Sequence, residues 1–217
     1  MSFERPRAIL FDWDNTLVET WPTIHAALFE TFTAMGVTPW TLAETKTRVR
    51  LSMRESFPVL FGDRWTEARD VFYDAYGRLH LSSLIACDGA GELLSGLHGA
   101  GFYLGVISNK TGHYLRAEAA HLGWDGYFGR LVGAGDAARD KPAPEPVAMA
   151  LDGSGIPAGR SVWMIGDSGV DMEIAHATGL VAVLVGADRA SMTEFDACPP
   201  HRQVADCRSL LALLRAT

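Results

Sequence analysis

Short apolar runs rich in β-branched residues recur along this 217-residue chain, and an amphipathic helical pattern follows most of them. The runs are apolar at consecutive positions, which is typical of strands buried on both faces of a parallel sheet. The strands are predicted at residues 8–11, 103–107, 131–132, 162–165 and 181–185. Helices are predicted at 91–98, 112–121, 144–151 and 170–178, with Gly179 as a helix stop. This alternation predicts an α/β fold, a doubly wound parallel sheet.

One region interrupts the alternation. Between residues 18 and 84 the pattern contains no convincing strand and favours helices at 21–35, 43–54 and 65–84. Pro22 suits the first turn of the first of these helices. We therefore expect a core made of residues 1–17 and 85–217, with residues 18–84 inserted as a separate helical subdomain. The aromatic residues of the insert are interpreted as its own core.

Composition and charge narrow the class of protein. Apolar residues make up 48% of the chain, enough for a sizeable core, and the formal net charge of −7 argues against a nucleic-acid-binding surface. No run approaches the ~18 apolar residues of a membrane span, and the N-terminus lacks the pattern of a secretory signal. The three cysteines have neither zinc-site nor redox-motif spacing, which indicates a reducing compartment. We expect a cytoplasmic monomer or homodimer that binds neither membrane nor nucleic acid.

Polar residues follow the predicted strands at the places where an open α/β sheet binds ligands. Ligands of such sheets lie outside the carboxyl ends of the strands. Each residue alone has an ordinary interpretation, such as a helix cap or a turn, but independent caps would not gather at one edge. The residues expected at this edge are Asp12, Asp14, Ser108, Asn109, Lys141, Asp167 and Asp171.

The spacing of the aspartates favours one shared site. Asp12 and Asp14 are two apart, so they can face one side of an extended chain while Trp13 faces the other. Asp171 can face back toward Asp167 if a helix begins between them. Crowded carboxylates raise one another's pKa. Mg²⁺, which prefers oxygen ligands and often shares them with a phosphate, would relieve that repulsion.

Four segments together resemble the haloacid dehalogenase superfamily, specifically its magnesium-dependent phosphatases. FDWDNTLVET resembles the first motif, Asp-x-Asp-x-Thr after an apolar strand, and VISNK resembles the second, a Ser or Thr ending a strand. Lys141 in DKPAPEP resembles the third, and IGDSGVDMEIAHATG resembles the fourth. The insert resembles the α-helical cap of the phosphoglycolate-phosphatase-like branch. The resemblance implies a Rossmann-like core, a cap, and Mg²⁺ as the cofactor.

The resemblance also implies a role for each residue. Asp12 would be the nucleophile that forms a phospho-aspartate. Asp14 would protonate the leaving oxygen and then deprotonate water, and its backbone carbonyl would reach the metal. The phosphate would be held by Thr16, Ser108, Asn109 and Lys141, and the metal by Asp12, Asp14, Asp167 and Asp171.

Three residues need separate mention. Asn15 stands where this branch usually has Gly, and Asn tolerates a positive φ better than most residues, so we expect it to hold the same backbone conformation. Arg50 and Arg54 lie four apart in the insert and are candidates to meet a substrate anion, although a solvated helix face is the more ordinary interpretation.

The expected function is hydrolysis of a small phosphorylated metabolite, phosphoglycolate-like or a sugar phosphate. A phosphosugar mutase or other phosphotransferase of the same fold is the alternative, and a non-enzymatic binding protein is a further one. Asp14 argues against a dehalogenase, which needs no acid for a phosphate leaving group. The chain after the first strand lacks the glycine fingerprint of a dinucleotide-binding oxidoreductase.

Overall fold

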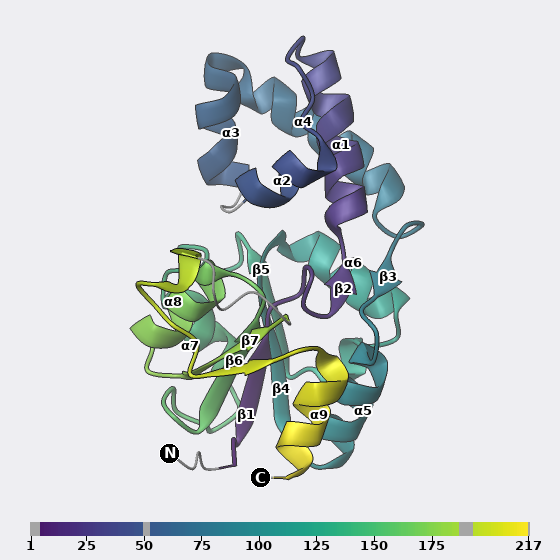
Figure 1. The fold of residues 1–217 in the computed structure, drawn as a ribbon. Helices are drawn as coiled ribbons and strands as arrows, with labels where there is room; N and C mark the ends of the chain where they lie inside the picture. The colour runs from purple at the N-terminus through teal and green to yellow at the C-terminus, as the bar shows by residue number, and fades with distance from the viewer. Residues whose placement is uncertain (1–4, 50–52, 187–192, 217) are drawn as a thin grey trace. The chain divides into compact units, whose positions relative to one another are not determined.

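The computed structural model describes residues 5–49, 53–186 and 193–216 (Figure 1). Contacts divide the chain into two compact units: Met1–Val18 with Ala86–Thr217, called the core unit here, and Glu19–Ile85, called the insert. The boundaries expected from the sequence each lie one residue from these.

The core unit is built on a six-stranded parallel sheet of order β5-β4-β1-β6-β7-β8. The α/β, doubly wound prediction is confirmed. Two predicted strands, 8–11 and 181–185, match their observed bounds, and β4 runs four residues past the predicted end. The strands are β1 (Ala8–Phe11), β4 (Tyr103–Thr111), β5 (Arg130–Ala134), β6 (Val162–Gly166), β7 (Val181–Val185) and β8 (Arg202–Val204).

Helices cover both faces of this sheet. Leu10, Met164 and Leu184 pack into one buried cluster with residues of α7 and α8. Because side chains alternate along a strand, the neighbouring residues Ile9 and Phe11 point to the opposite face. Figure 1 shows α5 and α9 side by side, in agreement with their contacts. The helices are α5 (Ala90–Gly99), α6 (Gly112–His121), α7 (Glu145–Leu151), α8 (Gly169–Ala177) and α9 (Cys207–Arg215), with 3₁₀ turns at Asp125–Tyr127 and Thr193–Phe195.

The insert is helical, but the predicted helix 43–54 is wrong. That helix ends at Arg48, because the backbone of Val49 is extended (φ −81°, ψ 99°), and Arg54 belongs to the next helix. The helices are α1 (Trp21–Ala34), α2 (Leu42–Arg48), α3 (Met53–Phe61) and α4 (Trp65–Leu79), with a 3₁₀ turn at Gly62–Arg64.

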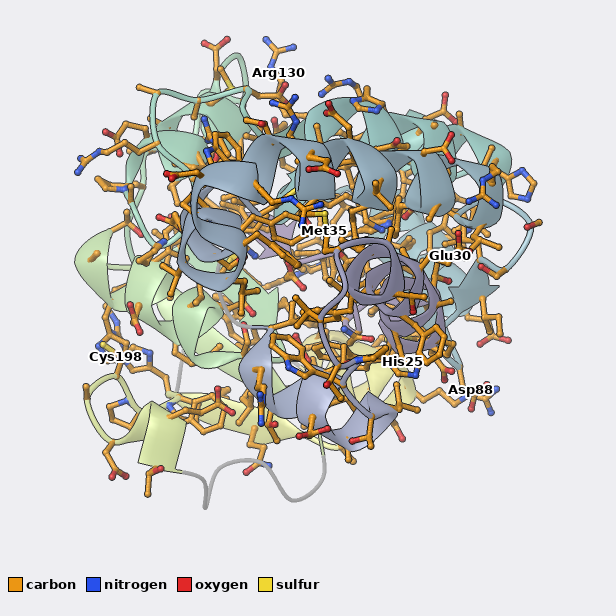
Figure 2. The ribbon with its side chains drawn as sticks, turned by 90° about the horizontal axis from the view of Figure 1, so that it is seen from above. His25, Glu30, Met35, Asp88, Arg130 and Cys198 are labelled. Atoms are coloured by element: carbon orange, nitrogen blue, oxygen red, sulfur yellow. The ribbon has the colours of Figure 1, made fainter. Side chains whose placement is uncertain are left out.

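Aromatic rings fill the interior of the insert. Phe57 meets Phe61 and Phe72 edge to face, and Phe32 packs against Phe61 at 5.4 Å between ring centroids. On its surface Glu30, labelled in Figure 2, pairs with Arg78 at 2.8 Å and so ties α1 to α4. The interpretation of the aromatic residues as core holds for these rings, although Phe29 is 51% exposed. No helix in the described ranges is long and apolar enough to cross a membrane.

A short ribbon marks both ends of the insert. β2 (Val18–Glu19) pairs with β3 (Ile85–Ala86), and next to it the N–H of Cys87 donates to the carbonyl of Leu17 at 2.9 Å. Neither β2 nor β3 was predicted, because two residues are too few to show a pattern of alternation.

Candidate active site

The first site residue is placed by the central strand. Asp12 follows the last residue of β1, and its N–H donates to the carbonyl of Ile165 in β6 at 2.8 Å. Its side chain lies at the carboxyl edge of the sheet and the residue is 6% exposed. A buried carboxylate therefore lies at the point where β1 ends.

A tight turn follows Asp12. The carbonyl of Trp13 accepts N–H groups from Leu17 (2.9 Å) and Val18 (3.2 Å), and Asn15 N–H donates to Val18. Asn15 has φ 62°, and it is the non-glycine residue with positive φ among the described residues. The expectation that Asn15 replaces Gly in a left-handed conformation is confirmed.

Lys141 joins two of the aspartates. Its ammonium lies 2.6 Å from Asp12 Oδ1 and 2.7 Å from Asp171 Oδ1, and the residue is 4% exposed. Burial alone would lower the pKa of Lys141, but Asp12 and Asp171 raise it above its ordinary value. Asn109 Nδ2 donates to the Lys141 carbonyl at 3.1 Å and steadies the loop, whose Lys141–Pro142 bond is cis. Lys141 therefore stays protonated beside Asp12.

Three carboxylates form a group that suits a cation. One oxygen each of Asp12, Asp167 and Asp171 lies within 4.8 Å of the others, and all three residues are buried. Burial raises the pKa of Asp12 well above its ordinary value; Lys141 opposes this, while Asp171, Asp167 and Asp14 add to it. A divalent cation with a preference for oxygen ligands would offset that repulsion and keep Asp12 ionised. The donor set therefore fits Mg²⁺.

Asp171 is held on its other side by the start of α8. Its Oδ2 accepts from the N–H (3.1 Å) and the hydroxyl (2.7 Å) of Ser168. A Cβ at Gly166 would lie 2.2 Å from Asp171 Cγ, so only glycine fits at the end of β6. The expectation that Asp171 turns back toward the strand end agrees with this geometry.

The predicted phosphate-binding residues of the core unit lie at the same edge. Thr16 is 1% exposed and donates to Asp12 Oδ2 at 3.3 Å. Ser108, in the last part of β4, is 4% exposed and accepts the N–H of Lys110 at 3.1 Å. Arg50 lies outside the described residues, and Arg54 is an exposed residue of α3 in the insert.

The structure adds two residues that the sequence interpretation did not single out. Lys110 lies 2.7 Å from Asp14 Oδ1 and 2.5 Å from Glu118 Oε2, and Trp13 Nε1 donates to the same Glu118 oxygen at 2.7 Å. Glu118 is fully buried on the face of α6 that carries Leu115. The sequence signal that could have pointed to Glu118 is a glutamate on the apolar face of a predicted helix. That signal does not identify Lys110 and Trp13 as its partners.

A family model described as haloacid dehalogenase-like hydrolase matches residues 9–185, most of the chain. The chain belongs to this family. Phosphoglycolate phosphatase of Xanthomonas campestris pv. campestris is 30% identical over 182 residues, 82% of each protein. That of Rhodospirillum rubrum is 31% identical over 192 residues, 83% of this chain and 79% of the relative. A haloacid dehalogenase-like protein from Bacteroides fragilis superposes with a TM-score of 0.84 at 25% identity, covering 93% of this chain and 97% of its own.

These similarities confirm the resemblance predicted from the four motifs. The matched segment, 9–185, contains every aspartate of the acidic group as well as Lys141. The prediction of a hydrolase of this family is therefore confirmed.

Proposed function

We propose that this chain is a Mg²⁺-dependent phosphatase that hydrolyses a small phosphorylated metabolite, phosphoglycolate-like or a sugar phosphate, through a phospho-aspartate on Asp12. The observation that carries the proposal is the buried Asp12 carboxylate, joined at 2.6 Å to Lys141 and grouped with Asp167 and Asp171. The named relatives support the substrate class, since both are phosphoglycolate phosphatases. We place the enzyme in the cytoplasm.

Asp12 supplies the nucleophile. A carboxylate oxygen of Asp12 attacks phosphorus, and the bond from phosphorus to the substrate's alcohol oxygen breaks. An anionic nucleophile is repelled by an anionic phosphoryl group, so positive charge must lie beside both. Lys141, protonated and buried, provides one such charge, and electrostatic stabilisation of this kind carries much of phosphoryl-transfer catalysis.

Asp14 acts as the general acid and then as the general base. It gives a proton to the departing alcohol oxygen and then takes one from the water that attacks the phospho-aspartate. That attack releases inorganic phosphate and returns Asp12 to its carboxylate form. Thr16, Ser108 and Asn109 orient Asp12 and the phosphoryl oxygens.

Asp12, Asp167 and Asp171 would hold Mg²⁺ in this proposal, together with the carbonyl of Asp14. Bound there, the ion would neutralise the carboxylates and the charge of the phosphoryl oxygens. We assign substrate selection to the insert, with Arg50 and Arg54 as the candidate partners of a substrate anion.

The nucleophile assignment is tested with Asp12→Asn. The variant should fold normally, because the amide is isosteric and Lys141 keeps Asp171 as a partner, and its turnover should fall by at least ~10³-fold. Inorganic phosphate release from a panel of phosphorylated metabolites is the measurement, with circular dichroism as the check on folding. Near-normal turnover would exclude Asp12 as the nucleophile, and conversion of a sugar phosphate without phosphate release would indicate a mutase.

The metal assignment is tested by stability as well as by activity. EDTA should abolish phosphate release and Mg²⁺ should restore it. Mg²⁺ at 100 times its dissociation constant should also stabilise the fold by about 2.7 kcal/mol, seen as a rise in melting temperature. Asp167→Asn should remove most of that rise, and an equal rise in both proteins would place the ion elsewhere.

A further inference from the structure

Asp14, the residue that moves protons in the proposed function, stands apart from the acidic group. The cation-binding set contains Asp12, Asp167 and Asp171 but not the Asp14 carboxylate. That carboxylate is paired with Lys110 instead, at 2.7 Å, and its side chain keeps 21% exposure. Something must therefore hold it away from a nearby cation site that would attract it.

Lys110 is itself fixed from behind. Its side chain is 5% exposed, and its ammonium also contacts Glu118 Oε2 at 2.5 Å. Glu118 is fully buried and accepts the indole N–H of Trp13 at 2.7 Å on the same oxygen. A buried carboxylate is costly unless it is paired and hydrogen-bonded, so Glu118 holds the ammonium firmly.

Glu118 is held in turn by Trp13, the residue between the two aspartates of the first motif. Trp13 is fully buried and packs edge to face on Trp124, at 5.9 Å between ring centroids, and on Phe128, at 6.4 Å. The indole therefore has little freedom, and it orients Glu118.

The two lysines of the site have parallel positions. Lys141 joins Asp12 to Asp171, which lies in the first turn of α8. Lys110 joins Asp14 to Glu118, which lies in α6. Each aspartate of the first motif is thus tied by a buried ammonium to a carboxylate on a different helix.

We propose that Lys110, anchored by Glu118 and Trp13, is a positioning residue that holds the Asp14 carboxylate at the leaving oxygen and out of the cation's coordination shell. This inference rests on the proposed function, because it assumes that Asp14 protonates the leaving group. Lys110 itself takes no part in bond making or breaking.

The test compares two substrates that differ in their need for an acid. An aryl phosphate such as p-nitrophenyl phosphate has a good leaving group and needs little protonation, whereas an alkyl phosphate such as phosphoglycolate needs a full proton transfer. The parameter kcat/KM covers only the steps up to departure of the alcohol, so hydrolysis of the phospho-aspartate does not enter it.

Lys110→Met would take the ammonium away from the buried Glu118 carboxylate and is prone to misfold. The double variant Lys110→Met/Glu118→Gln removes both charges, and the new amide oxygen can still accept from Trp13. We expect kcat/KM of the double variant to fall about tenfold or more on the alkyl phosphate, and less than about threefold on the aryl phosphate. Arg116→Met, on the same helix as Glu118, breaks the ion pair of Arg116 with Asp136 in the loop after β5 and should change neither value.

The outcomes separate this inference from the proposed function. Asp14→Asn should show the same selective loss, by roughly 10²- to 10⁴-fold on the alkyl phosphate; without that selectivity, the acid role of Asp14 fails. If Asp14→Asn is selective but the double variant loses both substrates equally, the role of Lys110 is merely structural. A rise in KM for both substrates with kcat unchanged would make Lys110 a substrate-binding residue. Either of the last two results overturns the inference.

Discussion

Gly166 offers the sharpest test of how the site is assembled. It ends β6, and an added Cβ would lie 2.2 Å from Asp171 Cγ, 2.3 Å from Oδ2 and 2.4 Å from Cβ. Real carbon atoms do not approach so closely, so Gly166→Ala must displace the Asp171 side chain. Displacement separates Asp171 from Lys141 (2.7 Å) and from Ser168. One methyl group at a residue without chemistry of its own should therefore damage the site.

The magnitude follows from these contacts. Overpacking a buried position costs about 1–3 kcal/mol, and weakening a buried ion pair adds to this, so we expect a loss of about 3 kcal/mol. For a domain of this size that corresponds to a melting temperature lower by about 6–12 °C. Misplacing Asp171 and Lys141 by about 1 Å should lower kcat/KM by roughly 10- to 100-fold.

Gly99→Ala is the matched control. Gly99 is the exposed last residue of α5, and apart from its chain neighbours and the backbone of its own helix no described atom lies within 4 Å of its added Cβ. This variant should gain about 0.5–1 kcal/mol, because alanine loses less backbone entropy than glycine on folding. Urea and thermal unfolding with a phosphate-release assay are the measurements. A Gly166→Ala protein within about 2 °C of wild type and fully active would refute the reasoning.

Two further predictions concern backbone conformation and pH. The free energy of unfolding of Asn15→Gly should lie within about 0.5 kcal/mol of the wild-type value, whereas that of Asn15→Ala should be lower by about 1–2 kcal/mol, because φ of residue 15 is 62°. Equal urea midpoints for the two variants would contradict this. Burial raises the pKa of the Cys207 thiol to about 11, so the unfolded thiol ionises first and stability should fall by roughly 2–3 kcal/mol as pH rises from about 9 to about 11. Urea titrations of Cys207→Ala should show a shallower fall, and the partly exposed Cys198→Ala should follow wild type; parallel curves for all three would exclude Cys207 as the cause.

The sequence predicts the elements whose side chains repeat a simple pattern. β1 and β7 are fully buried apolar runs, and their predicted bounds match. β8, Arg202–Val204, was missed because two of its three residues are polar, as an edge strand permits. The helix predicted at 43–54 ends early at Arg48, and no Gly or Pro near that point signals the end.

The site residues also divide into those that a simple sequence pattern predicts and those that it does not. Asp12 and Asp167 were found because each directly follows the end of a buried strand, where topology alone places it at the carboxyl edge. The contact of Lys110 with Glu118 was not found, because pairing of side chains depends on how α6 packs against the sheet. Neither residue was singled out from the sequence, and the pattern of this helix alone does not show which ammonium meets Glu118.

The ribbon of β2 and β3 has a consequence for how such proteins diversify. Because the two strands pair, and because Leu17 and Cys87 are hydrogen-bonded beside them, the chain leaves the core unit and returns to it through adjacent backbone. An insertion point with its two ends so close accepts a segment of another length or architecture without stretching the core. The insert can thus be replaced as a cassette, by recombination in nature or by grafting in the laboratory, while the carboxylates and lysines at the strand ends stay in place.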